Sequence, residues 1–298
     1  MPCRAFLSAP FLALAMFLPL DAFGWNAAGH RLSVAVAWPG LSEPVKRKVD
    51  AILSAHPDAA RWQAVGRSEW PGERLGEAAV WPDVIRRAER MRAERDGDRV
   101  DDERIHRDWH YLDWPIGGAM AEARGGQIDR QIERLSRIVA DTARPAEERA
   151  IALAWLAHLV GDAHMPLHVA TWRDEEGNWT AGGNGVAVLD SAQPKHPENN
   201  LHRFWDELPG KSSLRGKRLF ERADALRSRH PPEKLALGSA IDWIRESHAT
   251  ASSIIPPPGP RPWSVDTGYR ERAREIADRQ IAAAGARLGA LLEALLGP

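Results

Sequence analysis

Apolar residues recur at helical spacing along most of the chain, and this pattern predicts a succession of helices. The first two predicted helices span residues 27–38 and 43–53. Further amphipathic stretches predict helices at residues 127–140, 146–159, 214–229, 232–248 and 267–296. Strand-like character is limited to residues 186–189, which follow a glycine-rich turn. We therefore expect an all-α fold, built as a single mainly helical domain with one short strand.

One segment departs from this amphipathic pattern. Residues 86–107 alternate charges of both signs without a hydrophobic stripe of normal width. Such a pattern is typical of a solvated helix or an extended surface excursion. Direct contact with a substrate is the alternative interpretation.

The N-terminus has the pattern of a signal peptide. Arg4 precedes an apolar run over residues 6–20, and small residues at Ala22 and Gly24 stand just before Trp25. The run is shorter than the roughly 20 residues that a spanning helix needs. We expect residues 1–24 to be removed, leaving a domain of residues 25–298 that is periplasmic or secreted and has no stable membrane association. An uncleaved N-terminal anchor is the alternative.

The composition limits which side chains could bind a metal and how the protein could bind a polyanion. The only cysteine, Cys3, belongs to the expected signal peptide, so any metal in the mature chain must be bound by histidine and carboxylate side chains. The 298 residues include 40 Lys and Arg against 41 Asp and Glu, a net charge of -1 that gives no global positive field for a polyanion. Binding of a nucleic acid would therefore need a local binding site on the protein. The chain is rich in tryptophan and histidine, with 13 Trp and 11 His.

Histidine and aspartate concentrate in the segment from His158 to His168. On a helix, His158 and Asp162 are four residues apart and share one face, so imidazole and carboxylate can converge on one cation. Pro166 ends the helix and lets His168 turn toward a neighbouring position. His164, between these residues, is better suited to orienting a neighbour than to binding metal. The alternative is a set of independently hydrogen-bonded polar groups in the core.

Other candidate ligands lie far from this segment in the sequence. His202 and Asp206 repeat the spacing of four, and because zinc takes about four ligands, the two pairs are expected to complete each other. Asp83 and His110 each offer one possible ligand beside bulky aromatic residues. Cleavage after Gly24 would also free the α-amine of Trp25, which could chelate a metal together with His30.

Taken in order, these motifs resemble the zinc-dependent nuclease S-one/P-one (S1/P1) family, to which bacterial zinc phospholipase C is related. The resemblance runs from Trp25 and His30 through Gly182-Gly183-Asn184 to His202, Asp206 and the C-terminal helix. It implies the mainly α-helical fold of the zinc phospholipase C and nuclease P-one type, with a trinuclear zinc cleft. One zinc ion would be held by Asp83, His110, His158 and Asp162. A second would be held by His168, His202 and Asp206. The third would be held by the amine and carbonyl of Trp25, by His30 and by Asp162 as a bridge.

The resemblance also implies roles in catalysis and substrate binding. Asp162 would bridge two zinc ions that activate water for attack at phosphorus. Arg86 resembles the arginine with which the family stabilises the phosphate, and Asp113 could fix it through a bidentate pair, although an exposed salt bridge is the alternative. Tyr111 could stack against a base, with ordinary packing as the alternative, and Asn184 belongs to the glycine-rich loop and is expected to contact substrate.

The function implied is a secreted zinc-dependent endonuclease that binds single-stranded DNA, RNA and nucleotides. We expect the protein to be a monomer. It would hydrolyse phosphodiester bonds to 5′-phosphate products and act as a 3′-nucleotidase. A zinc-dependent phospholipase C is one alternative, and Asp206 together with the segment from Trp81 to Arg86 favours the nuclease. A non-catalytic zinc-binding protein is the other, and it would need neither Arg86 nor a stacking residue.

Overall fold

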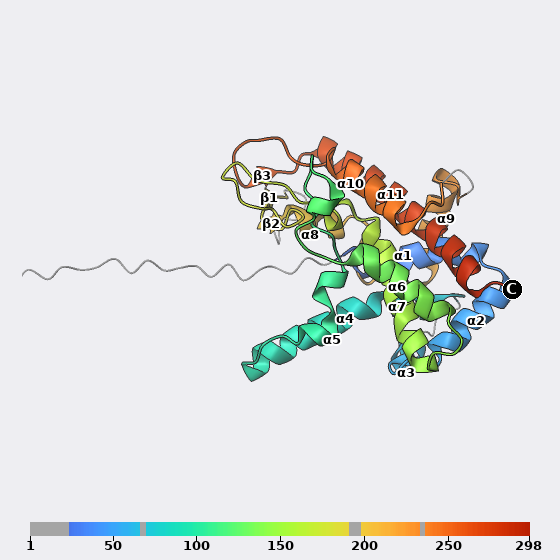
Figure 1. Cartoon of the computed structure of the whole chain (residues 1–298). Helices are drawn as coiled ribbons and strands as arrows, with labels where there is room; N and C mark the ends of the chain where they lie inside the picture. The colour runs from blue at the N-terminus through green and yellow to red at the C-terminus, as the bar shows by residue number, and fades with distance from the viewer. Residues whose placement is uncertain (1–23, 66–69, 191–197, 233–235) are drawn as a thin grey trace, which may run out of the picture.

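The computed structural model describes residues 24–65, 70–190, 198–232 and 236–298. Residues 1–23, which make up nearly all of the expected signal peptide, lie outside this part of the chain. The fold is mainly helical, as the sequence predicts (Figure 1). Among the described residues, no helix combines the length and the apolar character needed to cross a membrane.

Helix α7 (Ala146–Ala163) runs through the middle of the molecule. It is buried on every side from Ala152 to Ala163, which explains why its sequence lacks a strong polar face. The helices packed around it are α1 (Ala27–Ala37), α2 (Glu43–Leu53), α4 (Glu73–Asp96), α6 (Ile128–Ala140), α10 (Ala240–Ala251) and α11 (Thr267–Leu296). A residue on α7 is therefore held rigidly and shielded from water.

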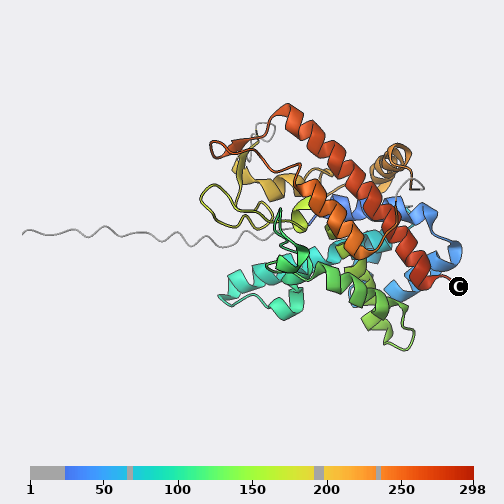
Figure 2. The ribbon, with the colours of Figure 1, turned by 45° about the horizontal axis from the view of Figure 1, so that its top comes forward.

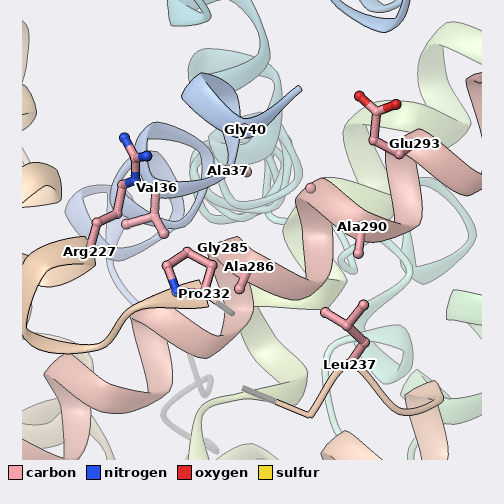
Figure 3. A pocket seen from close by; sticks show the side chains of 11 residues that line it. Val36, Ala37, Gly40, Arg227, Pro232, Leu237, Gly285, Ala286, Ala290 and Glu293 are labelled. Carbon is pink, nitrogen blue, oxygen red and sulfur yellow. The ribbon is translucent and has the colours of Figure 1, made fainter. Parts of the chain in front are cut away.

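Helices α1 and α11 pack closely because small residues line their contact. A β-carbon at Gly285 of α11 would lie 2.5 Å from Val36 Cβ, so only glycine permits this approach. Beside the contact, the two helices and residues near Pro232 and Leu237 line an apolar groove of about 310 Å³ (Figure 3). Helix α9 (Gly216–Arg229) packs on α1 and α11 from the same side.

The charged segment at residues 86–107 is the outer half of α4 followed by the short helix α5 (Asp102–Ile105). These elements form an arm that leaves the body of the molecule (Figures 1 and 2). The expectation of a solvated helix holds for most of the arm, but Arg86, Glu89 and Ala93 are buried. The remaining α-helix, α3 (Ala59–Val65), packs against α4.

The strands form one small sheet in the order β2-β1-β3. Strand β1 (Ala187–Leu189) confirms the predicted strand, and it pairs antiparallel with β2 (Glu198–Asn200) and parallel with β3 (Trp263–Ser264). Short helical turns complete the fold at η1 (Trp38–Gly40), η2 (Arg107–Trp109), η3 (Met120–Glu122), η4 (Pro166–His168) and α8 (Leu201–Asp206).

One predicted helix was wrong in its extent. The pattern over residues 232–248 predicts a continuous helix, but α10 begins only at Ala240. Gly238 adopts a left-handed backbone with φ of 55°, and the Ser239 side chain forms a capping box with Asp242. The serine and the aspartate three residues later are a helix-start signal, so the sequence did contain the true boundary.

Candidate metal centre

The centre is built around the end of α7, where His158 and Asp162 face the same side as predicted. His158 Nε2 lies 3.0 Å from Asp162 Oδ2. His158 Nδ1 is 2.8 Å from the carbonyl oxygen of Ala79 on α4. The bond to Ala79 fixes the ring so that Nε2 points toward Asp162.

Asp83 and His110 reach the same place from α4 and from the turn after η2. His110 Nδ1 is 3.0 Å from Asp162 Oδ2 and 2.9 Å from His158 Nε2. Asp83 Oδ1 lies 4.0 Å from His158 Nε2. The predicted group of Asp83, His110, His158 and Asp162 is thus brought together from three separate segments.

His168, His202 and Asp206 form a second buried group. Their potential ligand atoms all lie within 4.8 Å of one another. His168 Nδ1 is 2.6 Å from the carbonyl oxygen of His110, and His202 Nδ1 is 2.8 Å from that of Gly182. Gly182 has φ of 62°, and a β-carbon there would lie 2.3 Å from Leu167 O. The glycine-rich loop therefore orients His202, a role that the sequence analysis did not recognise.

His30 enters the centre from α1 and stacks on His158 with ring centroids 4.0 Å apart. Its Nε2 is 3.5 Å from Asp162 Oδ1 and 4.0 Å from Asp83 Oδ2. The backbone before Trp25 touches the same carboxylate, because a β-carbon at Gly24 would lie 1.8 Å from Asp162 Oδ1. The start of the expected mature chain therefore lies directly beside Asp162.

The candidate ligands lie together in one buried cluster, so burial and their neighbours' charges shift their pKa values. Burial would raise the pKa of Asp162, but His158 and His168 hold it well below its usual range. Burial raises the pKa of Asp206 well above its usual range, and the charges of Asp83 and Asp162 raise it further. Burial, followed by the nearby His158, lowers the pKa of His30 to about 3. Several buried carboxyl groups and imidazoles thus converge in a space that a cation would stabilise.

The donor set fits zinc. His30 Nε2, Asp162 Oδ1 and Asp206 Oδ1 are buried and form no hydrogen bond within the described structure. Two ligands of one tetrahedral zinc lie about 3.4 Å apart, given bonds of about 2.1 Å. The pairs His158–Asp162, His30–Asp162 and His202–Asp206 lie 3.0, 3.5 and 3.7 Å apart. Imidazole nitrogen and carboxylate oxygen are ordinary zinc ligands, so these residues can hold the metal without large rearrangement.

Two other histidines near the centre do not join it. His164 Nδ1 is 2.7 Å from Val160 O, and Arg287 Nη1 donates to His164 Nε2 over 2.8 Å, so these two contacts do not reach a candidate metal ligand. His106, four residues before His110, stacks on Trp109 with ring centroids 3.7 Å apart. The sequence analysis did not single out Trp155. Its ring centroid lies 5.2 Å from that of His110, so it packs against one side of the centre.

Arg86 lies at the edge of the centre, but its expected carboxylate partner was wrong. Arg86 is 3% exposed, and its Nη2 donates to Asp83 Oδ1 over 3.0 Å. This buried contact replaces the expected pairing with Asp113 because Arg86 and Asp83 are one turn apart on α4. Burial raises the pKa of Asp113 to about 6, against the opposing charges of His168 and Arg124. Asp113 therefore lies on the His168 side of the centre.

The two residues predicted to contact the substrate, Tyr111 and Asn184, have different structural surroundings. Tyr111 is half-buried next to His110, and burial raises the pKa of its hydroxyl. The Asn184 side chain donates to Ala181 O over 2.8 Å, so its amide also holds its own turn.

Comparison with known proteins identifies the class to which this fold and cluster belong. The family described as S1/P1 Nuclease matches residues 25–297. The chain belongs to this family, and it is a hydrolase of phosphodiester bonds that acts on nucleic acid.

Its relatives include proteins named as nucleases from a fungus and a plant. Nuclease S1 of Aspergillus oryzae (strain ATCC 42149 / RIB 40) is 23% identical over 326 aligned positions, which cover 98% of each chain. Endonuclease 1 of Arabidopsis thaliana is 26% identical over 61% of this chain and 52% of its own length. Endonuclease 4 of the same plant is 38% identical over 22% of this chain and 18% of its own length.

Proposed function

We propose that the protein is a zinc-dependent endonuclease that cleaves single-stranded DNA and RNA to 5′-phosphate products and also acts as a 3′-nucleotidase. The observation that carries this proposal is the convergence of His110, His158 and Asp162 with two further histidine and aspartate groups in one buried centre. Membership of the S1/P1 family supports the nuclease over a phospholipase C or a non-catalytic zinc protein.

The ligands would hold three zinc ions in the arrangement that the resemblance implies. Asp83, His110, His158 and Asp162 would hold the first, and His168, His202 and Asp206 the second. His30, Asp162 and the amine and carbonyl of Trp25 would hold the third. When bound, zinc would polarise the phosphate and activate water for in-line displacement at phosphorus.

The protein's own groups would position the phosphate and its charge. Asp162 can serve two metal positions because its Oδ2 faces His110 and His158 while its Oδ1 faces His30. Arg86, held by Asp83, would donate to a phosphate oxygen as negative charge builds up on it. Asp113, on the His168 side, would orient the substrate at the rim. Tyr111 would stack against an unpaired base, which duplex DNA does not offer.

The cellular setting is part of the same proposal. Cleavage after Gly24 would give a monomeric domain of residues 25–298 that is secreted or periplasmic and does not stay on the membrane. It would also create the Trp25 amine beside Asp162. Release from a membrane anchor and completion of the metal centre would then be one event.

The test is hydrolysis by the mature, zinc-loaded protein of four substrates: single-stranded DNA, single-stranded RNA, duplex DNA and phosphatidylcholine. We expect both single strands to be cleaved to products with 5′ phosphates, at rates well above that for the duplex. A mononucleotide with a 3′ phosphate should also release inorganic phosphate. Hydrolysis of phosphatidylcholine alone would replace the proposal with a phospholipase C. Three tightly bound zinc ions without hydrolysis of any substrate would favour a zinc-binding protein.

A further inference from the structure

Two arginines converge on one tryptophan beside the metal centre. The guanidinium carbons of Arg124 and Arg173 each lie 4.4 Å from the centre of the Trp179 ring. Both arginines are exposed, and the tryptophan is half-buried. We call these three residues the Arg–Trp–Arg cluster. An indole face attracts a cation, so the ring holds the two charges close together although they repel each other.

Backbone contacts tie the cluster to two of the candidate metal ligands. Arg124 belongs to the loop that follows His110, and Trp179 to the hairpin that follows His168, in which Arg173 and Trp179 form a β-bridge. The loop and the hairpin are joined because Leu112 N donates to His168 O over 2.8 Å and Ile116 N donates to Thr171 O over 2.8 Å. The cluster therefore keeps a fixed position relative to the centre.

The nearby carboxylates do not pair directly with the two arginines, although the charge of Arg124 opposes the burial that raises the pKa of Asp113. Within the described ranges, neither Arg124 nor Arg173 forms an ion pair. Asp174 accepts from the Asn178 backbone N–H over 2.7 Å and so shapes the hairpin. Glu175 accepts from Gly259 N over 2.7 Å. Asp174 and Glu175 thus have structural partners of their own. Arg173 donates to the carbonyl oxygen of Gly177, a neutral acceptor that does not cancel its charge. The two arginines are exposed, so their charges can act on a ligand in solvent.

Resting on the proposed function, we infer that the Arg–Trp–Arg cluster binds a phosphate of the single-stranded substrate that lies outside the bond being cleaved. Arginine guanidinium groups match phosphate oxygens in geometry and charge, and a phosphate bound at the cluster would offset the repulsion between its two positive charges. Because neither arginine is a candidate metal ligand, the cluster would add affinity for longer strands without changing the chemical step. The cluster would not raise the affinity for a mononucleotide.

The test measures binding and cleavage separately. Binding of the zinc-loaded protein to a fluorescent twelve-nucleotide strand with phosphorothioate linkages would be followed by anisotropy between 50 and 200 mM KCl. The variants are Arg124→Gln, Arg173→Gln and the double variant. The control is Arg144→Gln, a 51% exposed arginine at the opposite end of α7 from the metal centre. Cleavage of the unmodified strand and of a 3′-mononucleotide would be measured in parallel.

Loss of one phosphate contact lowers the slope of log K against log salt by about 0.7 for a single strand. Over the fourfold salt range, this change corresponds to about a 2.6-fold smaller loss of affinity for the variant than for the wild type. We expect that decrease for the double variant, with a raised KM and unchanged kcat on the strand and unchanged kinetics on the mononucleotide. Trp179→Leu should weaken binding while keeping the salt slope, because both charges remain.

The outcomes separate this inference from the proposed function. A double variant with wild-type affinity and salt slope overturns the inference, whether or not the protein cleaves the strand. Equal changes in Arg144→Gln and the double variant would also overturn it, because they would show a general charge effect. Altered binding in the double variant without cleavage by any form would keep the cluster and reject the nuclease. Absence of both binding and cleavage in the wild type would reject both.

Discussion

Replacing Gly161 by alanine should displace a candidate metal ligand without removing one. Gly161 lies on α7 and faces His30, and a β-carbon there would lie 2.8 Å from His30 Nδ1 and 3.2 Å from its Cε1. His30 is fully buried and stacked on His158, so its ring has no free space into which it can move. The new methyl group should therefore push His30 away from Asp162.

Two opposing effects set the change in stability. Alanine is favoured over glycine inside a helix by about 0.8–1 kcal/mol. Overpacking a well-filled core typically costs about 1–3 kcal/mol. The free energy of unfolding should therefore fall by up to about 2 kcal/mol. Activity should suffer more, because a displacement of about 1 Å in a catalytic centre can lower the rate by about 10²-fold.

Two glycines on α11 supply matched controls. A β-carbon at Gly289 would make only ordinary contacts, the nearest 3.5 Å from Ala37 O, so Gly289→Ala should stabilise the protein slightly. A β-carbon at Gly285 would lie 2.6 Å from Ser33 O, so Gly285→Ala should destabilise the protein without changing the ligands. Urea unfolding, bound zinc and kcat/KM would be measured for all three variants. A Gly161→Ala protein that is more stable than wild type, binds three zinc ions and keeps full activity would refute this reasoning.

Three further predictions concern the metals and their surroundings. Chelation by EDTA should abolish hydrolysis. It should also lower the melting temperature, because the bound metals would join ligands from distant segments of the chain. An unchanged melting temperature would show that the metals do not hold these segments together. Arg86→Ala should lower kcat by about 10²–10³-fold with zinc content retained, as measured by steady-state kinetics and elemental analysis; near-normal turnover would leave Arg86 only its contact with Asp83. A protein beginning Met-Trp25, with the methionine verified by mass spectrometry, should lose one zinc and most of its turnover while keeping its helical circular dichroism spectrum; full activity would show that Trp25 only packs in the core.

The sequence predicted most of the helices because their boundaries are encoded locally. The helices at residues 43–53 and 267–296 were placed at their observed ends, where Ser42 and Asp266 stand at the N-cap positions. The inner half of α4 was missed because Pro82 lies inside the helix. Its outer half lacks a broad apolar face, so the sequence left a solvated helix and an extended excursion as alternatives there. That helix is stabilised by its contacts with α1 and α7, and the local pattern does not record such tertiary packing.

The spacing of histidine and aspartate predicted the members of the centre, but their contacts depended on the fold. The pair at residues 158 and 162 and the pair at residues 202 and 206 follow from helical geometry alone. The link between His168 and the His110 carbonyl joins segments that are 58 residues apart, so no local signal specifies it. The partner of Arg86 was predicted wrongly for a different reason. Asp83 lies one helical turn from Arg86, so the contact is local, but a carboxylate expected to bind metal was not expected to accept from an arginine as well.

The contact between Gly24 and Asp162 has a consequence for the cell that makes the protein. If the proposed cleavage after Gly24 takes place, then before it a peptide bond occupies the place where the mature protein would present its amine to the carboxylate. The precursor would then be latent, with one of its three metal positions incomplete. A nuclease that gains its last ligand only on leaving the cytoplasm would spare the messenger RNA from which it is translated, with no need for a separate inhibitor.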